Sequence, residues 1–192
     1  MGRQDKLPEV LTEEEQKAIL EQPNSRYPTG ERNYVMIKLM LNTGLRLSET
    51  TSLKWKHIDL TSGKLMVREG KGAKDRTLWI GEDMIDTLCN WKERQVEDIG
   101  SCDYVFTTLE GNPVQNRYVQ QLVKRLADKA NIDKSISPHT FRNTFATDLY
   151  RETGKIRLVQ KALGHSDLSN TMIYTHIVDE ELEDSMKNLL VE

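Results

Sequence analysis

Apolar residues recur at helical spacing through most of the chain, so the sequence predicts a mainly α-helical protein. The segment 31–43 is apolar around nearly its whole circumference, which is typical of a helix buried at the centre of a core. Thr12 and Glu15 form a T-x-x-E capping box, which predicts a helix start. The other predicted helices are one that runs from this box to before Pro23, one that begins at Pro138, and those over 82–96, 116–130, 155–163 and about 180–190.

The pattern changes to short extended runs between Trp55 and Ile80. Candidate strands cover 57–60, 65–68 and 76–80, and the segments between them are rich in turn-forming residues. The sequence therefore predicts a mainly α fold with a small three-stranded antiparallel β-sheet (α+β). Lys71 is expected at the tip of the second hairpin.

The ends of the chain differ from its middle. Residues 1–10 lack a period and contain Pro8, so we expect a tail or interdomain linker there, followed by one domain over 11–192. No apolar run is long enough to span a membrane, and the start lacks a signal-peptide stretch. Cys89 and Cys102 lack metal-site spacing. We expect free thiols in a soluble, cytoplasmic protein without a membrane partner.

Charge is unevenly distributed along the chain. The net charge is −3, but residues 1–21 hold six acids and three bases, and residues 179–192 hold six acids and one base. Five more bases than acids therefore lie in residues 22–178. This surplus is compatible with phosphate binding, although solvated surface helices often show the same balance.

One stretch, 137–176, concentrates residues that can act on a phosphate. His139 and Arg142 are three apart near a helix start, so they share a face. His165 directly follows a glycine that is expected to end a helix. Tyr174 is expected on a short turn or helix opened by a Ser-Asn-Thr cluster.

A further arginine lies far upstream of this stretch. Gly44 is expected to end the buried helix 31–43, and Ser48 is expected to cap a short helix that follows. Arg46 would then leave a turn at the end of a buried helix, where its guanidinium can be held rigidly. Glu49 is expected to pair with a neighbouring arginine.

The cations in this sequence could hold one phosphodiester, and Tyr174 has the oxygen for covalent attack on it. The five candidate cations are Arg46, Lys71, His139, Arg142 and His165. Nucleotide-hydrolysis loops and carboxylate metal clusters do not occur in the sequence, so we expect no metal and no cofactor. Taken singly, each residue has a plainer explanation as a surface pair, a hairpin charge or a half-buried core tyrosine.

The ordered set R…K…H-x-x-R…H…Y, together with its flanking residues, resembles the catalytic domain of tyrosine recombinases, the phage integrase family. The blocks that carry the resemblance are TGLRLSE, GKGAKDR, SPHTFRNTFAT and LGHSDLSNTMIYTH. It covers the chain from about Leu11 to the end. The resemblance implies the fold of the DNA breaking-rejoining enzymes and a site-specific recombinase that needs neither ATP nor metal.

The resemblance also implies a role for each residue of the set. Arg46 and Arg142 would bind and polarise the scissile phosphate, with His139 and His165 as further donors. Lys71 would be the general acid for the leaving 5′-hydroxyl. Tyr174 would be the nucleophile that forms a 3′-phosphotyrosyl link, and Glu49 would support the network without reacting.

The chain departs from the family pattern in three places. Asn143 stands where many relatives have histidine and Phe141 where many have leucine, and we expect both to affect only local packing. The usual N-terminal, core-binding helical domain is expected to be absent, since residues 6–12 resemble the linker that follows it.

The expected partner is a double-stranded DNA recombination site. The resemblance implies self-association on that DNA, as a tetramer that exchanges C-terminal helices. The apolar stripe of the terminal helix would then dock on a neighbouring subunit; alternatively, it docks on its own domain. Alternatives are a short stand-alone DNA invertase, a type IB topoisomerase and a non-catalytic DNA-binding regulator. A regulator that only binds DNA does not need a phenol at a fixed place in the order of the cations.

Overall fold

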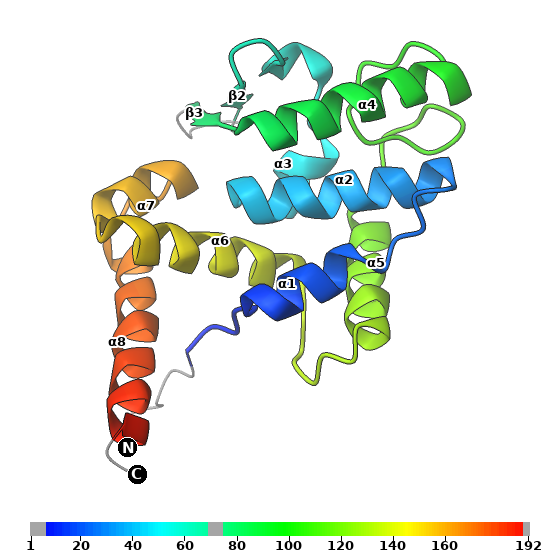
Figure 1. Ribbon diagram of the computed structural model, residues 1–192. Helices are drawn as coiled ribbons and strands as arrows, with labels where there is room; N and C mark the ends of the chain where they lie inside the picture. The colour runs from blue at the N-terminus through cyan, green and yellow to red at the C-terminus, as the bar shows by residue number, and fades with distance from the viewer. Residues whose placement is uncertain (1–6, 69–74, 190–192) are drawn as a thin grey trace.

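The computed structural model describes residues 7–68 and 75–189, which form a mainly helical domain with one small sheet (Figure 1). This confirms the predicted fold class. The helices are α1 (Glu13–Leu20), α2 (Pro28–Thr43), α3 (Leu47–Thr51), α4 (Glu82–Asp98), α5 (Asn116–Lys129), α6 (Pro138–Thr153), α7 (Ile156–Leu163) and α8 (Ser169–Leu189), with a 3-10 turn at Trp55–His57. The strands are β1 (Ile58–Asp59), β2 (Lys64–Val67) and β3 (Arg76–Trp79).

The three strands form an antiparallel sheet in the order β1-β2-β3, as predicted. Leu65 pairs with Leu78 and Val67 pairs with Arg76, and these four residues are buried. Because side chains alternate across a strand, they share the inner face of the sheet. The candidate strand over 57–60 is shorter than predicted, since His57 belongs to the 3-10 turn.

Helix α2 lies at the centre of the core, where α1, α4 and α6 pack against it. Its apolar residues are buried all round, as its sequence predicts, and include Val35, Met36, Ile37, Leu39 and Met40. Its neighbour α4 is fixed by Trp91, whose indole N–H donates to the carbonyl of Val105 over 2.8 Å. The predicted capping box of α1 is present at Thr12 and Glu15.

A second apolar cluster joins α6, α7 and α8 and contains Val159, Leu163, Tyr174 and Ile177. The sequence predicted Tyr174 on a short segment separate from a terminal helix at about 180–190, but the structure has one continuous helix, α8. Thr171, Tyr174 and Ile177 recur every three residues and are all buried, so one helical face packs on α6 and α7.

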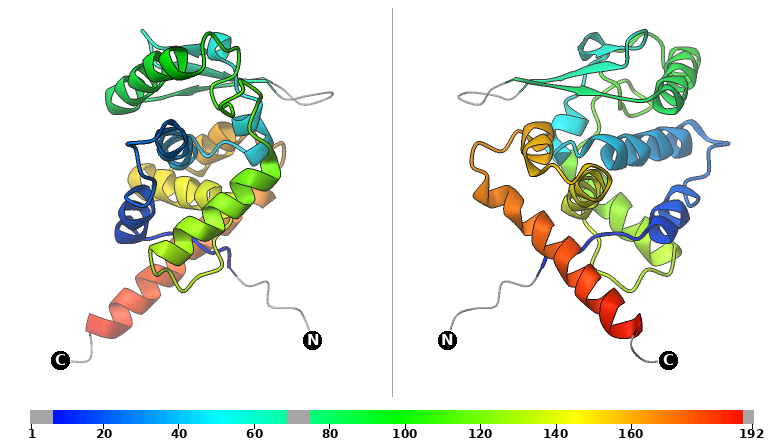
Figure 2. Two further views of the ribbon diagram at one scale, coloured as in Figure 1. Left: turned by 90° about the vertical axis from the view of Figure 1, so that its right-hand side faces the viewer. Right: turned by 60° about the vertical axis from the view of Figure 1, so that its left-hand side comes forward.

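The distal part of α8 points away from the rest of the domain (Figure 2). Leu182 and Met186 are exposed there. Among the described residues, none of the helices is both long and apolar enough to cross a membrane. Cys89 and Cys102 are free thiols, as predicted.

Candidate active site

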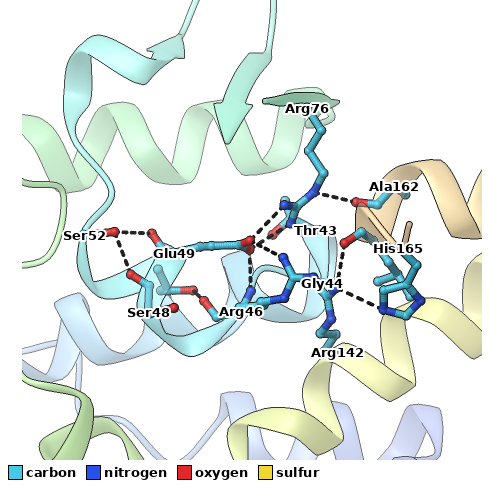
Figure 3. Close-up of polar contacts among 12 residues, drawn as sticks. Thr43, Gly44, Arg46, Ser48, Glu49, Ser52, Arg76, Arg142, Ala162 and His165 are labelled. Carbon is cyan, nitrogen blue, oxygen red and sulfur yellow. Dashed lines mark hydrogen bonds and ion pairs between the residues drawn. The ribbon is translucent and has the colours of Figure 1, made fainter. Parts of the chain in front are cut away.

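The ends of two helices meet at the side chain of Arg142, on α6 (Figure 3). Its guanidinium donates to the carbonyl of Gly44, which ends α2, over 2.5 Å and to the carbonyl of Leu163, which ends α7, over 2.6 Å. Carbonyls in the last turn of a helix lack intrahelical partners and carry partial negative charge. A cation therefore satisfies both helix ends, and Arg142 is held rigidly although it is only 6% exposed.

Gly44 allows this approach because it adopts a left-handed conformation, with φ of 61°. A Cβ at this position would lie 2.3 Å from the Cδ1 atom of the Phe145 ring. The close packing of α2 on α6 therefore requires glycine here. Burial, and then the charge of Arg46, lower the pKa of Arg142 to about 10, so it remains a cation at neutral pH.

His165 lies directly beside Arg142. Its Nε2 atom is 3.4 Å from the Arg142 guanidinium, and its Nδ1 atom is 3.0 Å from the hydroxyl of Thr171. Because arginine can only donate, Nε2 must accept, and we infer that Nδ1–H donates to Thr171. Burial, followed by the charges of Arg142, Arg46 and Arg76, lowers the pKa of His165 to about 4. The imidazole is therefore neutral at neutral pH.

Glu49, on α3, organises Arg46. Its carboxylate accepts from the backbone N–H of Arg46 over 2.7 Å and from the guanidinium of Arg46 over 2.8 Å. The predicted cap at Ser48 is wrong, since Arg46 is the N-cap residue and Glu49 is the third residue of the helix, which reaches back to it. The prediction that Glu49 pairs with an arginine is confirmed.

A second arginine, Arg76 on β3, binds the same carboxylate. It donates to Oε1 and to Oε2 of Glu49, over 2.8 Å each. Burial by itself would raise the pKa of Glu49, but the hydrogen bonds from Arg76 and Arg46 lower it to about 2. Glu49 is therefore ionised throughout the physiological range.

Arg76 ends the block GKGAKDR but is not among the residues that the sequence predicts for the site. The sequence does contain a signal that Arg76 is buried. In the predicted strand over 76–80, Arg76 alternates with Thr77 and shares the face of the buried Leu78. An arginine on the inner face of a sheet needs a buried partner.

Tyr174 lies on α8 and is 4% exposed. Its hydroxyl donates to Oδ1 of Asn143, on α6, over 3.2 Å. Burial raises the pKa of Tyr174, and the charge of Arg142 opposes that rise. The expectation that Asn143 affects only local packing is wrong, because it is the hydrogen-bond partner of the candidate nucleophile.

The structure therefore brings Arg46, Glu49, Arg142 and His165 into one cluster, with Tyr174 close enough for the Arg142 charge to act on it. His139 lies in the first turn of α6 and is exposed. Lys71 lies outside the described residues. Within the described part of the chain, His, Cys, Asp and Glu side chains form no group of three or more that could hold a metal ion.

The cluster carries a net positive charge. Arg46, Arg76 and Arg142 are cations, Glu49 is the anion that pairs with two of them, and His165 is neutral. Arginine donors arranged around one point are suited to the oxygens of a phosphodiester. A buried phenol at the edge of such a cluster is a candidate nucleophile.

Comparison with known proteins gives a consistent result. The Phage integrase family matches residues 9–181. Tyrosine recombinase XerD of Halalkalibacterium halodurans is 37% identical over 183 residues, which cover 93% of this chain and 60% of that protein. Tyrosine recombinase XerC of Xanthomonas axonopodis pv. citri is 37% identical over 172 residues, covering 90% of this chain and 55% of that protein. The chain thus spans somewhat more than half the length of these relatives.

Solved structures of recombinases are similar to this chain in fold. The crystal structure of XerA recombinase has a TM-score of 0.82 and 32% identity and covers 95% of this chain and 65% of that one. The XerH site-specific recombinase, bound to its palindromic difH substrate in a post-cleavage complex, has a TM-score of 0.80 and 30% identity, with coverage of 96% and 55%. A lambda integrase dimer bound to a core site shares the fold, with a TM-score of 0.70, 19% identity, and coverage of 90% and 60%.

Proposed function

Because the chain belongs to the phage integrase family and has the fold of a tyrosine recombinase catalytic domain, we propose that it cleaves and rejoins DNA strands at specific sites through a tyrosine nucleophile. The observation that carries the proposal is the position of Arg142. Two helix ends fix this cation beside Arg46 and His165, and its charge reaches the phenol of Tyr174.

In the proposed reaction, the Tyr174 oxygen attacks the scissile phosphorus. A 3′-phosphotyrosyl bond forms, and the bond from phosphorus to the 5′-oxygen breaks. Arg46 and Arg142 donate to the non-bridging oxygens, where negative charge increases in the transition state. The exposed His139 adds a further donor, and Lys71 protonates the leaving 5′-oxygen. His165 can add another only after its proton moves to Nε2, because in the resting structure that atom accepts from Arg142. A 5′-hydroxyl from a partner strand then attacks the phosphorus of the phosphotyrosyl link and gives its proton to the Lys71 amine. The bond from phosphorus to the Tyr174 oxygen breaks, and that oxygen takes up a proton from water, which restores Tyr174.

The resting position of the nucleophile requires a movement. Tyr174 is 4% exposed and donates to Asn143, so its oxygen must leave that contact to reach a phosphorus. The phenol loses its proton to water as it attacks, and Arg142 stabilises the phenolate that forms. We therefore propose that DNA binding and the movement of α8 are linked.

We also propose a double-stranded recombination site as the DNA partner. Relatives support this partner, since XerH and lambda integrase were solved on such sites, the latter as a dimer. Assembly into a tetramer through exchange of C-terminal helices is supported by the exposed Leu182 and Met186 on the distal part of α8. Residues 11–192 would be the catalytic domain and residues 1–10 the linker segment.

The test is covalent capture of DNA. The chain is incubated with a pool of nicked duplexes with randomised arms, and adducts that survive denaturant are counted. We expect an adduct with the natural chain, none with Tyr174→Phe, and an unchanged amount with the control Tyr27→Phe, since Tyr27 is 63% exposed. An adduct that persists in Tyr174→Phe would refute the assignment. DNA binding without any adduct would favour the non-catalytic regulator.

A further inference from the structure

The contacts of Arg76 tie together separate parts of the active site. Two of its N–H groups form a fork on the Glu49 carboxylate, over 2.8 Å each. Its Nε–H donates to the carbonyl of Ala162, near the end of α7, over 2.9 Å. One side chain on β3 therefore contacts both α3 and α7 (Figure 3).

The contact with Glu49 acts on Arg46. A carboxylate held by a bidentate arginine has both oxygens fixed in direction. These same two oxygens accept the backbone N–H and the guanidinium of Arg46. Arg76 thus orients the Glu49 carboxylate, and this carboxylate sets the direction of the Arg46 guanidinium.

The contact with α7 acts on His165. Arg76 binds the carbonyl of Ala162, and Arg142 binds the carbonyl of the next residue, Leu163. Gly164 then ends the helix, and His165 follows it. Two cations therefore fix the last turn from which the imidazole projects.

Stability alone does not explain such a pair. The side chains of Arg76 and Glu49 are only 6% and 8% exposed, so both charges have lost most of their hydration. Replacing a buried ion pair by well-packed apolar side chains is often neutral or stabilising. The value of the pair therefore lies in what it orients.

We infer that Arg76 is a positioning residue of the strand-cleavage reaction, which aims Arg46 through Glu49 and fixes the helix end that carries His165. This inference rests on the proposed function. Arg76 need not touch the phosphate to act in this way. It also lies on β3, which pairs with β2, so it joins the sheet to the arginine cluster.

The first test does not depend on catalysis. The carboxyl of Glu49 is titrated by carbon NMR in the natural chain and in Arg76→Gln. In the natural chain we expect it to remain ionised below pH 4, because two arginines bind it. In Arg76→Gln its pKa should rise from about 2 towards the ordinary value, because burial remains while the hydrogen bonds and the charge of Arg76 are lost. An unchanged titration would overturn the inference, whether or not the chain cleaves DNA.

The second test uses the nicked duplexes captured by the natural chain. For Arg76→Gln we expect the single-turnover cleavage rate at saturating DNA to fall about 10- to 100-fold, the cost of a small misplacement of catalytic groups. The dissociation constant for DNA should change by less than about threefold, since the lost interaction acts in the transition state. The rate should fall further as the pH is lowered from 7 to 4, because Glu49, which keeps only its contacts with Arg46, protonates in that range. An equal rate in both proteins would overturn the inference.

Three further variants serve as controls for the effect of Arg76→Gln on the cleavage rate. Arg76→Lys keeps the positive charge but cannot donate two parallel hydrogen bonds to Glu49. This variant should not show the additional loss of rate at low pH, but it should recover only part of the natural cleavage rate. The double variant Glu49→Gln with Arg76→Gln removes both buried charges and should lose less rate than the two single losses combined; fully additive losses would contradict a shared route through Glu49. Arg68→Gln makes the same charge change at an exposed position just after β2 and should keep the natural rate.

These experiments separate two kinds of failure. If the natural chain forms no adduct, the proposed function fails, and the Glu49 titration still decides whether Arg76 orients the carboxylate. If the natural chain cleaves DNA while Arg76→Gln matches it in rate and pH profile, the role of Arg76 fails and the proposed function stands.

Discussion

The buried carboxylate of Glu49 makes a measurable prediction about stability. Its pKa falls from the ordinary value of 4.5 to about 2 in the folded protein, which corresponds to roughly 2 to 3 kcal/mol after allowance for solvent screening. A carboxylate whose folded pKa is lowered contributes this stability above the unfolded pKa. The contribution is lost as pH falls from about 5 towards 2.

Glu49→Gln should therefore destabilise the protein most at neutral pH. The amide leaves the buried guanidinium of Arg76 without a counter-charge, so we expect a loss of about 3 kcal/mol at pH 7. At pH 4 the natural chain has itself lost about 0.8 kcal/mol from this group, so the difference between the two proteins should narrow by that amount.

Urea unfolding at pH 7, 5 and 4, followed by circular dichroism, measures this difference. Glu110→Gln is the matched control, because Glu110 is exposed and its replacement should change the free energy of unfolding by less than about 0.5 kcal/mol. A difference between Glu49→Gln and the natural chain that stays constant from pH 7 to pH 4 would refute the reasoning.

Two further predictions concern the same cluster. The imidazole of His165 should stay neutral from pH 8 to pH 5, since burial and then the charge of Arg142 lower its pKa to about 4; nitrogen NMR of the ring checks this, and a midpoint near 6.5 would contradict it. Gly44→Ala should cost about 3 kcal/mol in urea unfolding, because alanine is strained at a φ of 61° and its Cβ would overlap the Phe145 ring. Near-natural stability of that variant would show that α2 can move away from α6.

The fold was predictable where local signals were strong. The capping box at Thr12, the all-round apolar helix now called α2 and the turn residues between the strands placed most elements within a few residues. The continuity of α8 was not predictable in this way. Its first turns have weak helical signals, and they are held in helical form because Tyr174 and Ile177 pack on α6 and α7.

The active site was predictable as a set of residue types and not as a network. The order of cations and the phenol identified Arg46, Arg142, His165 and Tyr174, all of which the structure places in or beside one cluster. The sequence did not predict which residues far apart along the chain would pair. Arg76 and Glu49 are 27 residues apart in sequence, and the bond from Tyr174 to Asn143 depends on how α8 packs against α6.

The construction of the cluster explains how like charges can remain close together before any phosphate arrives. Arg142 satisfies the carbonyl ends of α2 and α7, and its three contacts account for three of its five N–H groups. Glu49 offsets the charges of Arg46 and Arg76. The cations are thus paired with dipoles and one carboxylate that hold them in fixed directions, and the pKa of Arg142 is still lowered by the charge of Arg46. A phosphodiester would relieve that residual repulsion, so the same arrangement that holds the arginines in place also favours binding of an anion.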